Sequence, residues 1–180
     1  MSLKIVTKMS VLLGADEMSS MFQERLTEYR ELLLACKGRQ CEKVFQQVAD
    51  RYEDDLLELE GFPDNYFKLV IDLLSDDSLY SKPGVWNFLL VLGTEQGRLQ
   101  PAHYDALAEC IVLNYERYSN TALCVAVCDF IARNYPAAKA KEVFSRLAAV
   151  EEKKPEALHG FVKDGLRILA AEERRVSTSH

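Results

Sequence analysis

The chain has 180 residues, with 22 basic and 28 acidic side chains and a net charge of −6. A chain of this length typically folds as one domain, and its few Gly and Pro residues favour helices. No apolar run approaches the roughly 18 residues that a membrane-spanning helix needs, and the apolar run near the N-terminus lacks a convincing signal-peptide cleavage site. Because ten acidic and only two basic residues lie within residues 50–77, we do not expect a nucleic-acid-binding protein.

The first predicted helical hairpin follows an N-terminal lead segment, residues 1–15. Within that segment, residues 3–13 keep neither a helical nor a strand period and stay ambiguous between a short helix and extended chain. A first helix is predicted over residues 16–36, where apolar side chains recur at three- and four-residue steps. Gly38 ends it, and a second helix follows on the stripe Cys41, Val44, Phe45, Val48 and Tyr52. These two helices should form a hairpin.

The middle of the chain predicts two further helices. Residues 61–63, Gly-Phe-Pro, end the acidic run, and Asp64 then caps a third helix. Residues 75–84 form a polar break, in which Pro83 suits the first turn of another helix. The run VWNFLLVLG at residues 85–93 could be a buried strand or a buried helix on length alone. We favour a helix, because no second strand candidate exists for it to pair with.

The C-terminal half predicts four helices, which begin near Pro101, Asn120, Pro136 and Pro155. The first of them is expected to end at Tyr118 and the last at about Arg174, with residues 176–180 as a disordered tail. The helix at residues 120–135 is apolar around most of its circumference, with Asn120 as a candidate N-cap. Such a helix is typically buried, so we expect it at the centre of the fold.

The spacing of the helix starts suggests a repeat. From Pro83 to Pro155 helices begin every 16 to 19 residues, so pairs of helices recur every 35 to 37 residues. That spacing fits stacked antiparallel helical hairpins, similar to HEAT or armadillo repeats. We therefore predict a single all-α domain over residues 16–175 with about eight helices. An irregular helical bundle is the alternative.

Catalytic and metal-binding motifs are not apparent in the sequence. His103 and His159 each lie in the first turn of a predicted helix, and neither has a partner at metal-ligand spacing. We interpret them as solvent-facing or capping residues. The sequence therefore predicts a protein that is not an enzyme and needs no cofactor or metal.

The five cysteines are an odd number, which is typical of reduced thiols in the cytoplasm. Cys110, Cys124 and Cys128 fit apolar helix faces, and we interpret them as packing residues. Cys36 and Cys41 flank a Lys-Gly-Arg turn and are the more plausible reactive pair.

The acidic segment, residues 50–77, can be interpreted in two ways. It is either a solvated face that confers solubility or a docking surface for a basic partner, because aromatic residues lie among its carboxylates. The Asp pairs at 54–55 and 76–77 are interpreted as solvent-facing. The predicted partner-binding residues are Asp50, Glu53, Asp54, Asp55, Glu58, Glu60, Asp64, Asp76 and Asp77, with Tyr80 and Trp86 as aromatic anchors.

Size, acidity and the blocks LELEGFPDNYF (57–67) and PGVWNFLLVLG (83–93) give the chain a resemblance to a family of bacterial proteins. It resembles the all-helical, HEAT-like immunity proteins encoded beside polymorphic toxins, including contact-dependent and type VI secretion effectors. The resemblance covers residues 16–174 and assigns no residue a role. It implies a cytoplasmic protein that binds one cognate toxin or effector domain and occludes its active site.

Two other hypotheses stay open at this point. One is a helical-repeat scaffold that holds a partner peptide or helix in a groove between hairpins. The other, a small-molecule regulator or an enzyme without a recognised motif, requires a deep pocket beneath residues 120–135.

Overall fold

The computed structural model describes residues 15–178. Within this range all regular elements are helices, which confirms the all-α prediction. The prediction for residues 3–13 lies outside the described residues.

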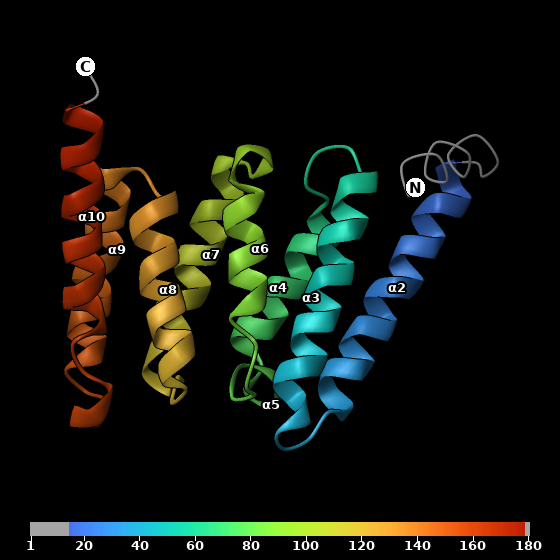
Figure 1. Ribbon diagram of the computed structural model, residues 1–180, viewed down its shortest axis with the longest axis horizontal. Coiled ribbons are helices and arrows are strands. Elements are labelled where there is room, and N and C mark those ends of the chain that lie inside the picture. The colour runs from blue at the N-terminus through green and yellow to red at the C-terminus, as the bar shows by residue number, and fades with distance from the viewer. Residues whose placement is uncertain (1–14, 179–180) are drawn as a thin grey trace.

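The longer helices pair along the chain into antiparallel hairpins (Figure 1). Within residues 15–178 the hairpins are α2 (Ala15–Ala35) with α3 (Gln40–Glu58), α4 (Asp64–Ser75) with α6 (Asn87–Thr94), α7 (Pro101–Asn114) with α8 (Thr121–Asn134), and α9 (Ala137–Glu151) with α10 (Phe161–Ser177). The short elements between them are α5 (Asp77–Tyr80), η1 (Gln96–Arg98), η2 (Tyr115–Arg117) and η3 (Glu156–Leu158).

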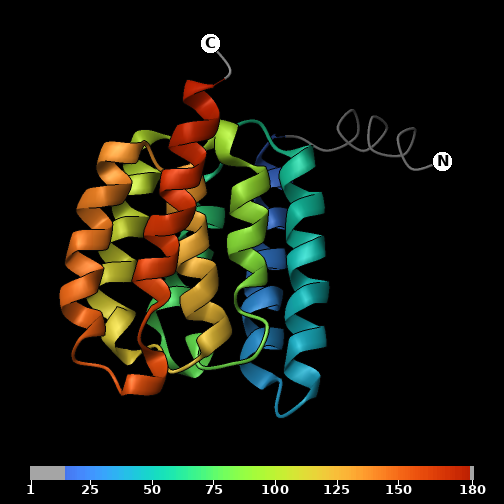
Figure 2. The ribbon, with the colours of Figure 1, turned by 60° about the vertical axis from the view of Figure 1, so that its left-hand side comes forward.

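The hairpins stack side by side in two layers (Figures 1 and 2). In the front layer of Figure 1, α3, α6, α8 and α10 contact one another in that order. In the back layer the contacts run from α2 to α4, α7 and α9. Because each hairpin packs on the next one along the chain, the stacked-hairpin prediction is confirmed.

The start of α8 follows from the sequence. The side-chain oxygen Oδ1 of Asn120 accepts hydrogen bonds from the backbone N–H groups of Ala122 at 3.0 Å and Leu123 at 3.3 Å. These groups would otherwise lack a partner in the first turn of the helix. The predicted N-cap is therefore confirmed.

Two helices begin later than their prolines predict. After Pro83 the chain first turns at Gly84, whose φ of 94° is accessible to glycine, and α6 begins only at Asn87. After Pro155 the chain forms η3 and passes through Gly160, with a φ of 98°, before α10 begins. In both places the glycine, rather than the proline, sets the helix start.

Two predicted ends also differ from the structure. The helix that begins at Pro101 ends at Asn114 and continues as the 3-10 turn η2 instead of reaching Tyr118 as an α-helix. At the other end of the chain, α10 extends to Ser177, so the first residues of the predicted disordered tail belong to this helix. The hydroxyl of Ser177 donates to the backbone oxygen of Glu173 at 2.9 Å, which supports this last turn.

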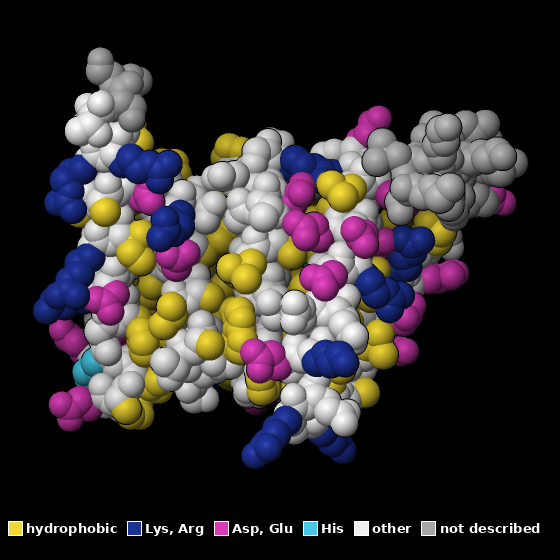
Figure 3. All heavy atoms as spheres, in the orientation of Figure 1, with side chains coloured by type: hydrophobic (Ala, Val, Ile, Leu, Met, Phe, Trp, Pro, Cys, Tyr) yellow, Lys and Arg dark blue, Asp and Glu magenta, His cyan; other side chains and the backbone are white. Residues whose placement is uncertain are grey.

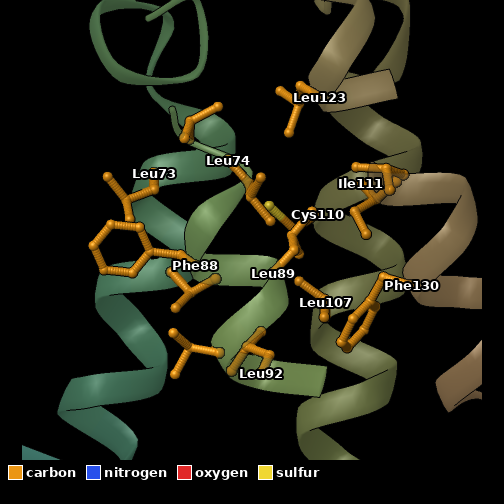
Figure 4. Packing of buried hydrophobic residues seen from close by; sticks show 14 of the residues in the cluster. Leu73, Leu74, Phe88, Leu89, Leu92, Leu107, Cys110, Ile111, Leu123 and Phe130 are labelled. Atoms are coloured by element: carbon orange, nitrogen blue, oxygen red, sulfur yellow. The ribbon is translucent and has the colours of Figure 1, made fainter. Parts of the chain in front are cut away.

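The core lies between the two layers. Figure 4 shows side chains from α4, α6, α7 and α8 directed toward one another, among them Leu73, Phe88, Leu92, Leu107 and Ile111. Leu and Phe at helical spacing on each helix supply this interface, as the sequence pattern predicts.

Helix α8 is buried less completely than its sequence suggests. Its inner side chains fill the core, with Leu123, Val127 and Ile131 fully buried. Its outer side faces solvent, since Val125 is 50% exposed. The neighbours α6, α9 and α10 contact the helix on its other sides, and its inner side chains belong to the packed core.

Helix α10 approaches α8 and α9 closely at Gly165. A Cβ atom at Gly165 of α10 would lie 2.6 Å from Cζ of Phe144 and 3.1 Å from Cβ of Cys128. We expect Gly165→Ala to lower the free energy of unfolding by about 1–3 kcal/mol, because this core has no room for an added carbon. Urea denaturation followed by circular dichroism measures the change.

Gly93→Ala is the matched control for this variant. Gly93 also lies in a helix, but a Cβ there would have the Asn134 side chain as its nearest neighbour, at 3.8 Å. Since alanine favours a helix more than glycine does, this variant should be more stable by about 0.5–1 kcal/mol. A similar loss of stability in both variants would contradict the packing at Gly165.

Candidate protein-binding surface

The accessible carboxylates of the acidic segment gather mainly on α3. Asp50, Asp54 and Glu58 are exposed and recur every four residues, which places them on one side of the helix. Figure 3 shows acidic side chains over α3, on the front layer. Glu53 is half-buried and accepts a hydrogen bond from Oγ1 of Thr94 on α6 at 3.0 Å. The predicted residues of α3, apart from Asp55, are therefore available to a partner.

Asp55 is not on the surface, and its interpretation as solvent-facing is wrong. Its side chain is only 3% exposed. Oδ2 accepts hydrogen bonds from the hydroxyl of Tyr29 at 2.7 Å and from that of Tyr66 at 2.9 Å, and Oδ1 pairs with Arg25. Burial and the bonds to Asp55 raise the pKa of both tyrosines above their usual range. Asp55 thus joins α2, α3 and α4 and cannot contact a partner.

Glu60 and Asp64 lie near the end of α3 and the start of α4, and both are exposed. Oδ1 of Asp64 is 3.3 Å from Nε2 of His103 on α7. These two residues can extend the acidic surface of α3 past its C-terminal end.

Asp76 and Asp77 belong to a different region. They follow the C-terminal end of α4, whose length of 12 residues separates them from Asp64 by roughly 18 Å. Hydrogen bonds from Ser78 and the nearby Arg30 guanidinium lower the pKa of Asp76, which caps α5. The acidic segment therefore does not form one continuous surface.

The two predicted aromatic anchors differ in how deeply they are buried. Tyr80 is only 5% exposed, and its ring packs against that of Tyr118 with centroids 5.2 Å apart. Its assignment as an anchor is therefore wrong, because the ring is part of the core. Trp86 directly precedes α6 and is half-buried, so part of its ring stays accessible.

A groove between α6 and α8 is the feature that the sequence did not reveal. It encloses about 300 Å³, and its lining includes Leu90, Gly93, Ala126, Asp129 and Arg133. Helix α6 carries no charged residue, and Leu90 on it is 58% exposed. Figure 3 shows hydrophobic side chains over this part of the front layer. Leu90 and the groove thus lie on the helix next to α3, and the α8 side of the groove carries the ion pair between Asp129 and Arg133.

The histidines hold structural positions. His103 is buried, and its Nδ1 accepts a hydrogen bond from the backbone N–H of Gln100 at 3.1 Å in a capping box of α7. Nε2 of the exposed His159 lies 2.7 Å from the backbone oxygen of Lys154. Among residues 15–178, no group of three or more His, Cys, Asp or Glu side chains is placed to hold a metal ion.

The three cysteines assigned to packing are buried: Cys110, Cys124 and Cys128. Burial raises the pKa of the Cys110 thiol to about 11 and that of the Cys128 thiol to about 12. Because these three thiols are buried, an oxidant in solution has little access to them, and we expect them to react slowly.

None of the described helices is long and apolar enough to cross a membrane. Comparison of the chain with models of protein families, with curated proteins and with solved structures finds no match.

Proposed function

We propose that this protein is a bacterial immunity protein, which binds a basic toxin or effector domain in the cytoplasm and neutralises it by covering the active site. One observation carries the proposal: the exposed carboxylates of α3 lie beside the uncharged helix α6 and the groove that it forms with α8. The resemblance in size, acidity and helical repeat supports the same function. The free thiols fit a reducing compartment.

The two parts of this surface would contribute differently to binding. Asp50, Asp54 and Glu58 would attract a basic domain and raise the association rate, an effect that weakens as salt rises. Leu90 and Val125 would lose contact with water in the complex, and such desolvated apolar contacts mainly slow dissociation. The inhibition itself needs no chemistry from this protein, since covering the active site is sufficient.

Reversal of the α3 charges tests the proposal. Capture from a lysate of the source organism, washed at low and then high salt, supplies the partner, which must be toxic when expressed alone. We expect the triple variant Asp50→Lys, Asp54→Lys, Glu58→Lys to raise the dissociation constant about 100-fold and to abolish protection against the toxin. Calorimetry and a growth assay measure the two effects.

The matched control changes the net charge equally at the other end of the stack. Glu116, Glu142 and Glu152 are exposed and lie on η2, on α9 and just after α9. Their reversal to Lys should leave affinity and protection nearly unchanged. Equal losses in both triple variants, or no loss in the α3 variant, would remove the α3 surface from the proposal.

The groove between α6 and α8 favours a second candidate function, a scaffold that binds a partner helix. A linear segment of such a partner should bind alone with most of the affinity of the whole partner. Loss of binding when the partner is reduced to that peptide would favour recognition of a folded domain.

A further inference from the structure

The turn between α2 and α3 brings two cysteines together. Cys36 follows the last residue of α2, and Cys41 is the second residue of α3. Between them Gly38 adopts a φ of 64°, and its backbone oxygen accepts a hydrogen bond from the N–H of Cys41 at 3.2 Å. Burial and the nearby Cys41 thiol raise the pKa of Cys36 to about 11, and the Cys36 thiol donates a hydrogen bond to the backbone oxygen of Leu33 at 3.2 Å. The two thiols are thus neighbours across a tight turn.

Lys82 holds the Cys36 side of this turn in place. Its ammonium donates hydrogen bonds to the backbone oxygens of Leu33 at 2.8 Å, Leu34 at 2.6 Å and Cys36 at 2.9 Å. The same Nζ lies 3.9 Å from Sγ of Cys36. Because these carbonyls are at the C-terminal end of α2, a cation there is also favoured by the helix dipole. Lys82, which lies between α5 and α6, therefore fixes the backbone of Cys36 at the end of α2.

The thiols border an accessible and basic site. An opening of about 600 Å³ is lined by both cysteines, by Lys82 and by the exposed residues Lys37 and Arg39. Cys36 is half-buried, whereas Cys41 is only 2% exposed. Positive charge around an opening attracts anions, and glutathione disulfide is an anionic small molecule with a reactive sulfur–sulfur bond.

We propose that Cys36 and Cys41 form an oxidation site. At this site an anionic small-molecule disulfide, such as glutathione disulfide, oxidises the two thiols to a disulfide bond between Cys36 and Cys41. The Cys36 thiolate attacks one sulfur of glutathione disulfide, the bond between its two sulfurs breaks, and the first glutathione thiolate leaves and takes up a proton. The Cys41 thiolate then attacks Sγ of Cys36 and expels the second glutathione. The two protein thiols are oxidised, and one glutathione disulfide is reduced to two glutathione molecules. This site is independent of any protein partner.

The position of the basic residues makes the product easy to detect. The folded full-length protein is incubated with glutathione disulfide, free thiols are alkylated, and the protein is digested with trypsin without reduction. Trypsin cuts after Arg30, Lys37, Arg39 and Lys43. The disulfide therefore appears in the mass spectrum as ELLLACK joined to QCEK, lighter by two hydrogen atoms than the two peptides together. Its formation rate should rise about tenfold per pH unit above neutrality, as the thiolate fraction of Cys36 does.

Two single variants separate the steps. In Cys41→Ser, the mixed disulfide of Cys36 with glutathione should accumulate, because the second thiol is missing. In Cys36→Ser, Cys41 should stay reduced, because it is buried. The proposal is overturned if the wild type yields no joined peptide, if it stops at the mixed disulfide, or if Cys110, Cys124 and Cys128 are oxidised at the same rate as the pair.

Discussion

Replacing Asp55 with alanine is expected to lower the free energy of unfolding by about 3–5 kcal/mol, because the change breaks a buried ion pair and leaves its partners unsatisfied. The hydroxyl groups of Tyr29 and Tyr66 would lose their acceptor, and Arg25 would lose its counter-ion. A loss of this size is a large fraction of the stability of a typical domain. Urea denaturation, followed by circular dichroism, measures it.

The neighbouring residue supplies the control. Asp54 has the same side chain but is exposed on the other side of α3, so Asp54→Ala should change the free energy of unfolding by less than about 0.5 kcal/mol. Asp55→Asn should be intermediate, because the amide retains one oxygen acceptor but no charge. Equal stability of the two alanine variants would show that the buried network does not hold the first two hairpins together.

Replacing Glu151 with alanine should have a comparable effect, about 3–5 kcal/mol, at the other end of the stack. Its Oε1 accepts from the hydroxyl of Tyr115 at 3.0 Å and from the N–H of Val162 at 3.2 Å, and its Oε2 accepts from the N–H of Gly160 at 2.9 Å. Glu151 thus joins the end of α9 to η2 and caps the start of α10. Without it, a buried hydroxyl and two backbone N–H groups lose their acceptor.

The charge balance of this region adds to the cost. Lys154 is buried, and its ammonium donates to the backbone oxygens of Tyr115 at 2.9 Å and Tyr118 at 2.6 Å. Glu151 and Lys154 both contact Tyr115, so removal of Glu151 would take a negative charge away from the surroundings of this buried cation. Glu152→Ala, at the exposed neighbouring position, is the control and should stay within about 0.5 kcal/mol of the wild type. Amide hydrogen exchange in the first turn of α10 should rise only in the Glu151 variant; unchanged protection there would contradict the capping role.

Much of the fold could be predicted because local chemistry determines it. Asn120 caps its own helix, and the regular distance between helix starts indicates stacked hairpins. The misplaced starts of α6 and α10 depend on Gly84 and Gly160, whose left-handed conformations are visible only once the chain is folded.

The candidate site was predicted less well, although one signal was present. The apolar stripe of α3 contains Val48 and Tyr52, and Asp55 lies three residues further on the same side of the helix. A carboxylate on an apolar stripe indicates a buried partner, so Asp55 could have been separated from Asp54. The identity of that partner, the pair Tyr29 and Tyr66 with Arg25, depends on which helices become neighbours.

The groove could not be predicted from periodicity at all. Leu90 belongs to an apolar run and Ala126 to an apolar helix in the sequence, and only the contact between α6 and α8 brings the two residues to one groove. Helical spacing determines which face of a helix is apolar, but not which other helix lies beside that face.

The two-layer stack also has a mechanical consequence. Its front layer is a series of contacts, from α3 to α6, from α6 to α8 and from α8 to α10, so bending is shared among the joints between neighbouring hairpins. A partner lying across α3, α6 and α8 would span two of these joints. Such a partner would hold the curvature of the stack at one value and stiffen the protein without changing any individual hairpin.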